Sequence, residues 1–151
     1  IRSYVDFVLT FEEVAGMFEA KGVDWKEIPE GEPLFCASSD GRGFAVSGGV
    51  AGAVVHAVKR IDPDREVKVM SAEGLQNCKK MLQMAKIGKY DGYLLEGMAC
   101  PGGCVAGAGT IQTVKKAAAA LEKMKKEASF TEAYDSEYKT RLESLEKFDV
   151  E

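Results

Sequence analysis

Short apolar runs alternate along the chain with stretches in which apolar residues recur three and four positions apart. The runs predict β-strands at residues 5–9, 67–70 and 93–95. The helical spacing predicts helices at residues 11–18, 50–61, 75–85 and 111–124. Strands that alternate with helices favour an α/β fold in three layers, with a mostly parallel sheet flanked by helices.

Polar residues mark the expected starts of these helices. Thr10 with Glu13 three positions later is a capping-box signature. Ser47 and Ser71 are expected to cap the second and third helices, because a serine hydroxyl can accept a hydrogen bond from the first turn. Residues 23–42 are rich in glycine, proline and polar side chains, and we expect a loop region there.

The end of the chain has a weaker connection to this pattern. Apolar spacing between Tyr134 and Leu145 predicts a final helix, which we expect to be peripheral. The chain is therefore divided into one α/β lobe over residues 1–128 and a peripheral C-terminal helix over residues 129–151.

Four single residues could carry chemistry but are expected to be structural. His56, the only histidine, falls in the middle of a predicted helix and is expected to be a partly exposed helix residue. Cys78 lies on an apolar helical stripe and is expected to be a small core residue. Trp25 and Cys36 are expected to be packing residues.

Composition narrows the functional classes. The 151 residues carry a formal charge of −4 with a pI near 5.2, which argues against nucleic acid as the main partner. No apolar run approaches the length of a membrane span, and no signal peptide opens the sequence, which begins at Ile1. The four cysteines do not form the pattern of a secreted disulfide framework, so we expect a reducing, cytoplasmic setting and a chain that is part of something longer.

Residues 96–109 contain the strongest chemical signal, two cysteines four positions apart. Cys100 and Cys104 would share one face of a helix, but Pro101 and the glycines at 102 and 103 disfavour a helix here. The segment is therefore expected to be a loop whose glycines allow the backbone to approach a bulky group closely. Two thiolates on a glycine-rich turn between a strand and a helix suit an iron–sulfur centre.

Two thiolates are too few to complete such a centre, which normally takes four protein ligands. The remaining ligands must then come from outside these two residues, and the chain alone should not hold a complete cluster. A Cys100–Cys104 disulfide, a redox dithiol and a purely structural turn are the alternatives left open by the spacing. The turn at Ser47, Gly48 and Gly49 also opens a helix, and its N–H groups could face an anionic ligand.

The longer sequence around the cysteines resembles a known family. Residues 98–104 (MACPGGC), followed by VAGAG, closely resemble the last of the three cysteine motifs of iron-only ([FeFe]) hydrogenases. Residues 44–50 (FAVSGGV) resemble the family's Ser/Thr-Gly-Gly-Val turn, and residues 5–10 with the helix after them resemble the segment that follows its second cysteine motif. The resemblance runs from about Tyr4 to about Lys116.

The resemblance implies a site. The family's H-cluster joins a four-iron cubane to a two-iron unit and is held by four cysteines. Cys100 matches a ligand of the cubane, and Cys104 matches the catalytic cysteine whose sulfur bridges the cubane to the two-iron unit. Met98 matches an apolar neighbour of that unit, while Ser47, Gly48 and Gly49 would let the backbone pack against it. The implied reaction is the reversible reduction of protons to dihydrogen.

The resemblance also implies partners. The family's first two cysteine motifs do not occur in this sequence, so the chain is expected to bind the remainder of the catalytic domain and, through it, a ferredoxin-type electron donor. The isolated chain is expected to be inactive and to expose an apolar inter-lobe face that could give a homodimer. Residues 107–111 read GAGTI where the family commonly continues Gly-Gly-Gly-Gln-Pro. A sensory relative or a non-catalytic iron–sulfur assembly factor of the same fold is therefore the alternative.

Overall fold

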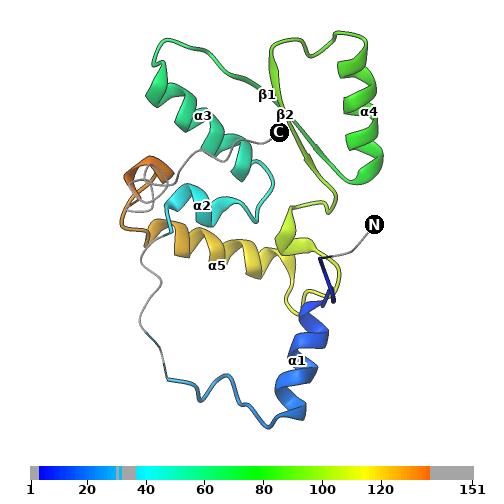
Figure 1. The fold of residues 1–151 in the computed structure, drawn as a ribbon, viewed down its shortest axis with the longest axis vertical. Helices are drawn as coiled ribbons and strands as arrows, with labels where there is room; N and C mark the ends of the chain where they lie inside the picture. The colour runs from blue at the N-terminus through cyan, green and yellow to red at the C-terminus, as the bar shows by residue number, and fades with distance from the viewer. Residues whose placement is uncertain (1–3, 30, 32–36, 137–151) are drawn as a thin grey trace.

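The computed structural model describes residues 4–29, 31 and 37–136. The helices and strands, in chain order, are α1 (Phe11–Ala20), α2 (Ser39–Gly43), α3 (Gly49–Ile61), β1 (Lys68–Glu73), α4 (Leu75–Lys86), β2 (Tyr93–Met98) and α5 (Val114–Lys126), shown in Figure 1. Two single turns of 3-10 helix are η1 (Cys104–Ala106) and η2 (Ala133–Asp135). The four predicted long helices and the last two predicted strands are confirmed.

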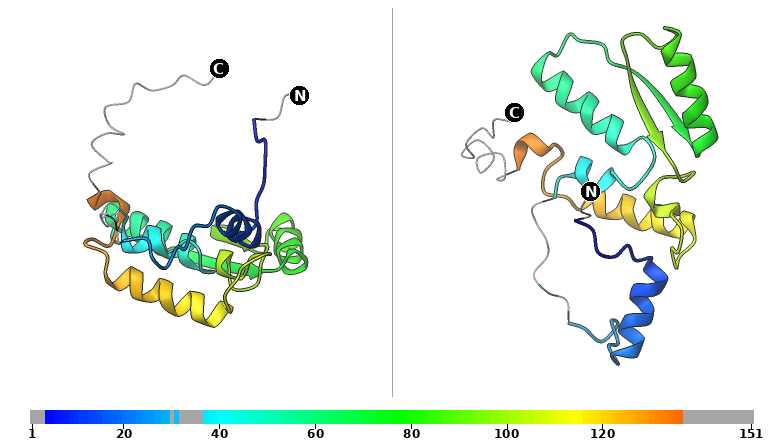
Figure 2. Two further views of the ribbon diagram at one scale, coloured as in Figure 1. Left: turned by 90° about the horizontal axis from the view of Figure 1, so that it is seen from below. Right: turned by 45° about the vertical axis from the view of Figure 1, so that its right-hand side comes forward.

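The two strands form a parallel pair between two helices. Their register runs from Lys68 opposite Tyr93 to Glu73 opposite Met98. Helices α3 and α4 lie on opposite sides of the pair (Figures 1 and 2). Successive residues of β2 face α3 and α4 in turn. Glu96 bonds to the start of α3, and a Cβ atom on Gly97 would lie 3.3 Å from the sulfur of Cys78 in α4. The α/β class is therefore confirmed, with a sheet of two strands in the described part of the chain.

The first predicted strand is wrong. Residues 5–9 are irregular, and Phe7 and Val8 are 83% and 87% exposed. A β-prone run becomes a strand only where another strand supplies hydrogen bonds, and the strand pairing in the described residues is that of β1 with β2 alone. The run leads into α1, which lies at the far end of the molecule from the sheet (Figure 1).

Of the three predicted helix caps, one is confirmed and two are wrong. The capping box of α1 is confirmed, because Glu13 N–H donates to the Thr10 hydroxyl oxygen while Thr10 N–H donates to the Glu13 carboxylate. The Ser47 prediction is wrong, since α3 starts from Gly48 in a left-handed conformation. The Ser71 prediction is wrong as well, because β1 runs through Ser71 and on to Glu73 before α4 begins.

The expected loop over residues 23–42 contains a short helix that the pattern did not predict. Helix α2 has five residues, and its only cap signal is Ser38, whose hydroxyl oxygen accepts a hydrogen bond from Gly41 N–H at 2.9 Å. The expected packing role of Trp25 is wrong, because its side chain is exposed. Cys36 lies outside the described residues.

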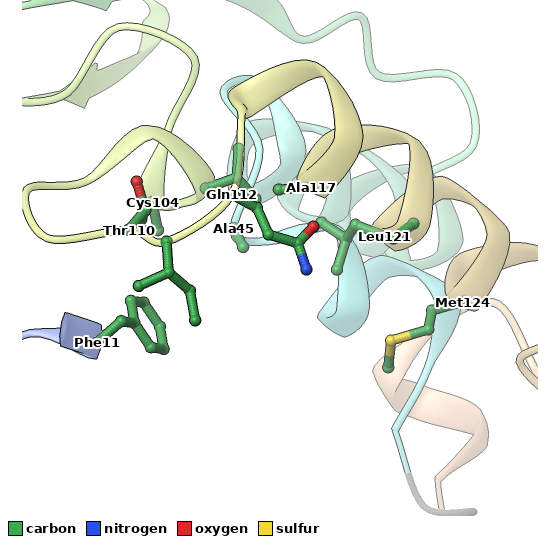
Figure 3. A pocket seen from close by; sticks show the side chains of 11 residues that line it. Phe11, Ala45, Cys104, Thr110, Gln112, Ala117, Leu121 and Met124 are labelled. Atoms are coloured by element: carbon green, nitrogen blue, oxygen red, sulfur yellow. The ribbon is translucent and has the colours of Figure 1, made fainter. Parts of the chain in front are cut away.

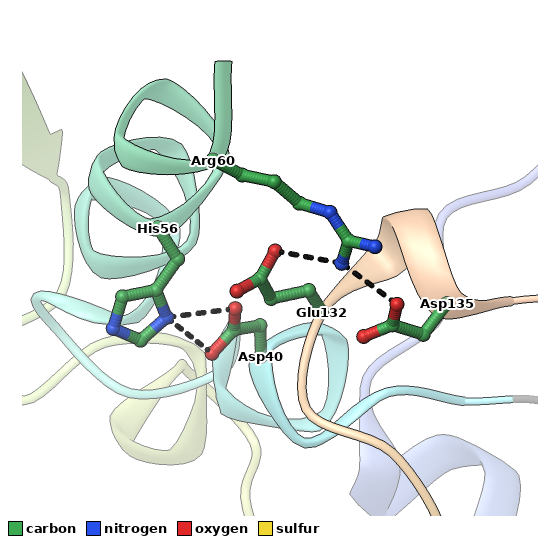
Figure 4. A network of polar contacts seen from close by, with 5 residues as sticks. All are labelled: Asp40, His56, Arg60, Glu132 and Asp135. Atoms are coloured by element: carbon green, nitrogen blue, oxygen red, sulfur yellow. Dashed lines mark hydrogen bonds and ion pairs between the residues drawn. The ribbon is translucent and has the colours of Figure 1, made fainter. Parts of the chain in front are cut away.

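The segment that follows α5 is bonded to α2 and α3. Ser39 and Asp40 donate backbone hydrogen bonds to the carbonyl oxygens of Phe130 and Thr131. Arg60 of α3 pairs with Glu132 at 3.2 Å and Asp135 at 2.7 Å (Figure 4). The predicted C-terminal helix falls mostly on residues outside the described part of the chain.

His56 belongs to the same polar network and lies away from the cysteines. Its Nδ1 is 2.9 Å from the Asp40 carboxylate, and its side chain is 49% exposed (Figure 4). The expected role as a partly exposed helix residue is confirmed.

Little apolar surface is fully buried in the described residues. The buried apolar residues are Ala51, Ala72 and Met81, and they lie where α3 and α4 meet the strands. Many large apolar side chains of α1 and the segment before it are exposed. Within residues 4–29, 31 and 37–136, no helix combines the length and the apolar character needed to cross a bilayer.

Candidate functional site

The cysteine loop, residues 99–109, follows the carboxyl end of β2. Gly102 and Gly103 have φ angles of 95° and 93°, which residues with a side chain rarely adopt. Gly103 N–H donates to the Cys100 carbonyl oxygen at 3.0 Å, and Cys104 starts the single turn η1. The prediction of a loop between a strand and a helix is confirmed, with α5 beginning only at Val114.

Close backbone contact joins the cysteine loop to the turn before α3. Ser47 N–H donates to the Gly102 carbonyl oxygen at 3.3 Å, and Val105 N–H donates to the Ala45 carbonyl oxygen at 3.1 Å. A Cβ atom on Gly103 would lie 2.6 Å from that same Ala45 oxygen. Gly103 is therefore required both by its φ angle and by the approach of the two segments.

The N-terminus of α3 is occupied by a carboxylate of the chain itself. Glu96 is 7% exposed, and its two oxygens accept hydrogen bonds from Gly48 N–H at 2.6 Å and from Ala51 N–H at 3.0 Å. The Ser71 hydroxyl donates to the same carboxylate at 3.3 Å. The expectation that these N–H groups face an external anion is wrong, because Glu96 takes the place of such a ligand.

A second carboxylate holds the loop from the end of β1. Glu73 accepts a hydrogen bond from Gly102 N–H at 3.0 Å. Neither Glu73 nor Glu96 was singled out from the sequence. The available signal was an acidic residue at or near the carboxyl end of each strand, which is where open α/β sheets bind ligands.

The far end of the loop is joined to α1. Glu12 N–H donates to the Gly109 carbonyl oxygen at 3.1 Å. Gly109 has a φ angle of 74°, and a Cβ atom there would lie 2.5 Å from the Thr10 Cβ atom. The second glycine-rich part of the motif therefore positions α1.

Cys104 lies between two largely apolar cavities. One, of about 510 Å³, lies along β2 and α3 and includes Met98, Glu96 and Val54 in its lining. The other, of about 440 Å³, lies between the start of α1 and α5, with Phe11 near Cys104 and Met124 at the far end (Figure 3). Cys104 therefore belongs to the lining of both cavities, either of which could accommodate part of a bulky group.

The predicted site residues fall into two groups. Cys104 and Met98 line the same cavity, whereas Ser47, Gly48 and Gly49 line a separate depression with α5. The turn reaches the cysteines through the backbone bonds already described, and its predicted contact with a cluster stays a prediction.

The cysteines differ in exposure. Cys100 is half-buried and Cys104 is exposed, and both are free thiols. Cys78 is also a free thiol, but it is half-buried and donates to the carbonyl oxygens of Ala72 and Met98, as expected of a core residue. Within the part of the chain that the structure describes, no three His, Cys, Asp or Glu side chains come together to hold a metal ion.

Comparison with known proteins identifies a family. Residues 1–108 match the family described as "Iron only hydrogenase large subunit, C-terminal domain". The large subunit of the periplasmic [Fe] hydrogenase of Nitratidesulfovibrio vulgaris is 31% identical over 134 residues, which cover 70% of this chain and 32% of that protein. The NADP-reducing hydrogenase subunit HndD of Solidesulfovibrio fructosivorans is 27% identical, covering 70% of this chain and 23% of that protein.

A relative with a different name also matches. The nuclear prelamin A recognition factor of Xenopus laevis is 28% identical over 141 residues, which cover 73% of this chain and 31% of that protein. The chain thus spans about a third or less of the curated relatives it matches.

Solved structures share the fold. An [FeFe]-hydrogenase studied for oxygen inactivation of its H cluster aligns with a TM-score of 0.56 at 18% identity, covering 86% of this chain and 48% of that chain. An [FeFe]-hydrogenase from Chlamydomonas reinhardtii aligns with a TM-score of 0.51 at 19% identity, with the same coverage of both chains. Since the family model covers more than half of the sequence, the chain belongs to the iron-only hydrogenase large subunit family and matches its C-terminal domain.

Proposed function

We propose that the chain is part of the catalytic domain of an iron-only hydrogenase that reversibly reduces protons to dihydrogen with electrons from a ferredoxin-type donor. The observation that carries the proposal is the cysteine loop, in which two free thiols follow a parallel strand and glycines bring the backbone against a second turn. The family match over residues 1–108 supports it.

The donor set fits half of an iron–sulfur site. Thiolates are the usual ligands of such clusters, and Cys100 and Cys104 supply two of the four that a cubane takes. The other two ligands would come from outside the described residues, in the remainder of the catalytic domain. When bound, the H-cluster would supply the redox chemistry of proton reduction.

The chain's own residues would bind and enclose the group. Cys100, half-buried, would be a cubane ligand, and the exposed Cys104 would be the bridging ligand. Met98 lines the cavity on the α3 side of Cys104 and would exclude water from that side. The contacts of Glu73 and of the Ser47 turn with Gly102 would keep the two thiols in a fixed arrangement.

The exposed apolar surface supports the proposed partner. Phe11 and Phe18 of α1 and the residues before the helix are exposed, and the remainder of the catalytic domain would cover them. The chain on its own would be inactive and could form a homodimer through this face. We propose a reducing cytoplasm as its location, because the sequence lacks the cysteine pattern of a secreted disulfide framework.

A second candidate is a non-catalytic relative that binds a cluster without producing dihydrogen. The observation that favours it is the similarity to the nuclear prelamin A recognition factor, together with the GAGTI sequence at residues 107–111. A protein of this kind would bind a cluster through the same two cysteines but would not produce dihydrogen.

The test is cysteine replacement in the full-length protein, matured with its complete cluster under anaerobic conditions. Cys100→Ser and Cys104→Ser should each lose most of the cluster iron, because a serine hydroxyl is a poor substitute for a thiolate. Cys78→Ser is the matched control and should retain it, since Cys78 is a core residue. Iron per protein and electron paramagnetic resonance measure the result.

The outcomes separate the candidates. Dihydrogen evolution from a reduced low-potential donor, with infrared bands of carbonyl and cyanide ligands, supports the hydrogenase. Iron binding without either signal favours the non-catalytic relative. Full iron retention in both loop variants would mean that the two cysteines are structural.

A further inference from the structure

We infer that Glu96 is a positioning residue that couples the turn before α3 to the cysteine loop. The inference rests on the proposed function, because it concerns the loop that would hold the cluster. Glu96 is set apart from the rest of β2 by its chemistry, since it is a buried carboxylate inside an otherwise largely apolar strand.

The Glu96 carboxylate accepts three hydrogen bonds. Gly48 N–H and Ala51 N–H, both from the start of α3, donate to different oxygens of the carboxylate at 2.6 and 3.0 Å. The Ser71 hydroxyl, opposite Glu96 in the register of the strand pair, adds a third donor at 3.3 Å. Charge-assisted bonds and the positive end of the helix dipole offset the burial of the negative charge.

One route from Glu96 to the cysteines runs along its own strand. Met98, which lines the cavity beside Cys104, is two residues further on, and Cys100 is four residues further on. A shift of the Glu96 side chain relative to α3 would therefore move the strand end that carries Met98 and the first thiol.

The other route runs through the turn. Gly48 is next to Ser47, whose N–H donates to the Gly102 carbonyl oxygen. Two residues earlier, the Ala45 carbonyl oxygen accepts a hydrogen bond from Val105, the residue after Cys104. The strand end before the cysteine loop and the turn bonded to the loop are thus both connected to the Glu96 carboxylate.

The geometry requires glutamate in particular, because both the carboxylate and the length of the side chain matter. Glutamine has the same shape, but its amide nitrogen is a donor and would face either Gly48 N–H or Ala51 N–H. Aspartate is one methylene shorter, and its carboxylate would lie further from the helix. Neither residue can accept all three hydrogen bonds.

The first experiment is hydrogen–deuterium exchange on the full-length protein without reconstitution. Glu96→Gln should raise exchange about tenfold in peptides covering residues 44–52 and 98–106, because the first region loses hydrogen bonds to the carboxylate and the second is bonded to the first. Glu73→Ala is the control, since it removes the single hydrogen bond from Gly102 N–H to Glu73, which a glutamine carbonyl oxygen could still accept. It should raise exchange in the second peptide alone.

The result that would overturn the inference is faster exchange in residues 44–52 of Glu96→Gln with no change in residues 98–106. Glu96 would then only cap α3. If Glu96→Gln fails to fold, Ser71→Ala takes its place, because it removes one donor and leaves the carboxylate. A smaller rise in both peptides supports the coupling, and no rise in the loop peptide contradicts it.

The second experiment measures the electronic properties of the cluster in samples of equal iron content. Glu96→Gln should shift the electron paramagnetic resonance spectrum and the reduction potential of the reconstituted protein, whereas Glu132→Gln should shift neither, because Glu132 pairs with Arg60 away from the cysteines. An unchanged spectrum and potential would contradict a role toward the site. If the unmodified protein binds no iron, the proposed function fails while the exchange result still decides whether Glu96 couples the two segments.

Discussion

The two sides of the cysteine loop are held in different ways. On the side of β1, β2 and α3, the loop meets buried groups, including Glu96 and the close backbone contact at Gly103. On the side of α1, the contact is the Glu12–Gly109 hydrogen bond and the packing of Gly109 against Thr10, and no residue of α1 is buried. The first side is fixed by long-range contacts and the second mainly by the local stability of one helix.

This difference bears on where the proposed partner, the remainder of the catalytic domain, would bind. A helix with a capping box can form from its own sequence, but an apolar stripe that is largely exposed contributes little to the stability of the fold. Phe11 and Phe18 lie on such a stripe, and Phe7 and Val8 precede it. The α1 side is therefore the surface that we expect the remainder of the catalytic domain to cover.

The largest change in stability is expected on the side of β1, β2 and α3. Gly49→Ala should destabilise the protein by about 3 kcal/mol, because the new Cβ atom would overlap the carbonyl oxygen of Gly43, a backbone atom that cannot easily move. Urea unfolding measures the change in the free energy of unfolding.

Gly52→Ala, in the same helix, is the control. Nothing lies within 4 Å of its Cβ position, so the higher helix propensity of alanine should stabilise the protein by about 0.5–1 kcal/mol. Equal effects of the two substitutions would show that the close approach at Gly49 does not constrain the fold.

A smaller effect is expected on the α1 side, and it should depend on context. Val8→Lys should change the stability of the 151-residue chain by less than about 0.5 kcal/mol, because this side chain is largely exposed. In the full-length protein the same substitution should cost about 2–3 kcal/mol, since the lysine would be covered by the other lobe. Thermal melts of the 151-residue chain and of the full-length protein measure the two changes in stability. Equally small changes would mean that the other lobe does not cover the α1 side.

The smallest expected effect is the pH dependence of α1. Hydrogen bonds from the Thr10 backbone N–H, and then from its hydroxyl, lower the pKa of Glu13. A lowered pKa means that the cap stabilises the helix above the unfolded-state pKa and is lost as the pH falls through the folded value. The protection of the first-turn amides, corrected for intrinsic exchange rates that fall in acid, should therefore decrease as the pH falls.

Glu13→Gln provides the control for that titration. Its amide does not titrate, so exchange of the α1 amides should lack the acid transition after correction for intrinsic rates. A transition of the same size in Glu13→Gln would assign the pH dependence to another group.

Local patterns predicted the four long helices but neither α2 nor the positions of every helix end. The capping box of Thr10 and Glu13 was predictable because all of its atoms belong to one turn. Ser71 has the sequence features of a cap, but pairing with Glu96 in the neighbouring strand keeps it in β1. Residues 5–9 were predicted as a strand because propensity does not reveal whether a partner strand exists.

The site was predictable to a similar extent. The loop conformation around Cys100 and Cys104 follows from proline and glycine in the sequence. The role of Glu96 does not, because a glutamate in a strand is usually solvent-exposed and its partners on α3 are 45 and 48 residues away in sequence.

The long sequence separation between Glu96 and α3 has a consequence for the order of folding. Contacts that close loops of 45 and 48 residues must pay the chain entropy of closure before they contribute, so they form later than the helices they join. The two thiols would then reach their final arrangement only after β1, β2 and α3 have assembled. Insertion of a cofactor at this loop would therefore be a late event in the maturation of the protein.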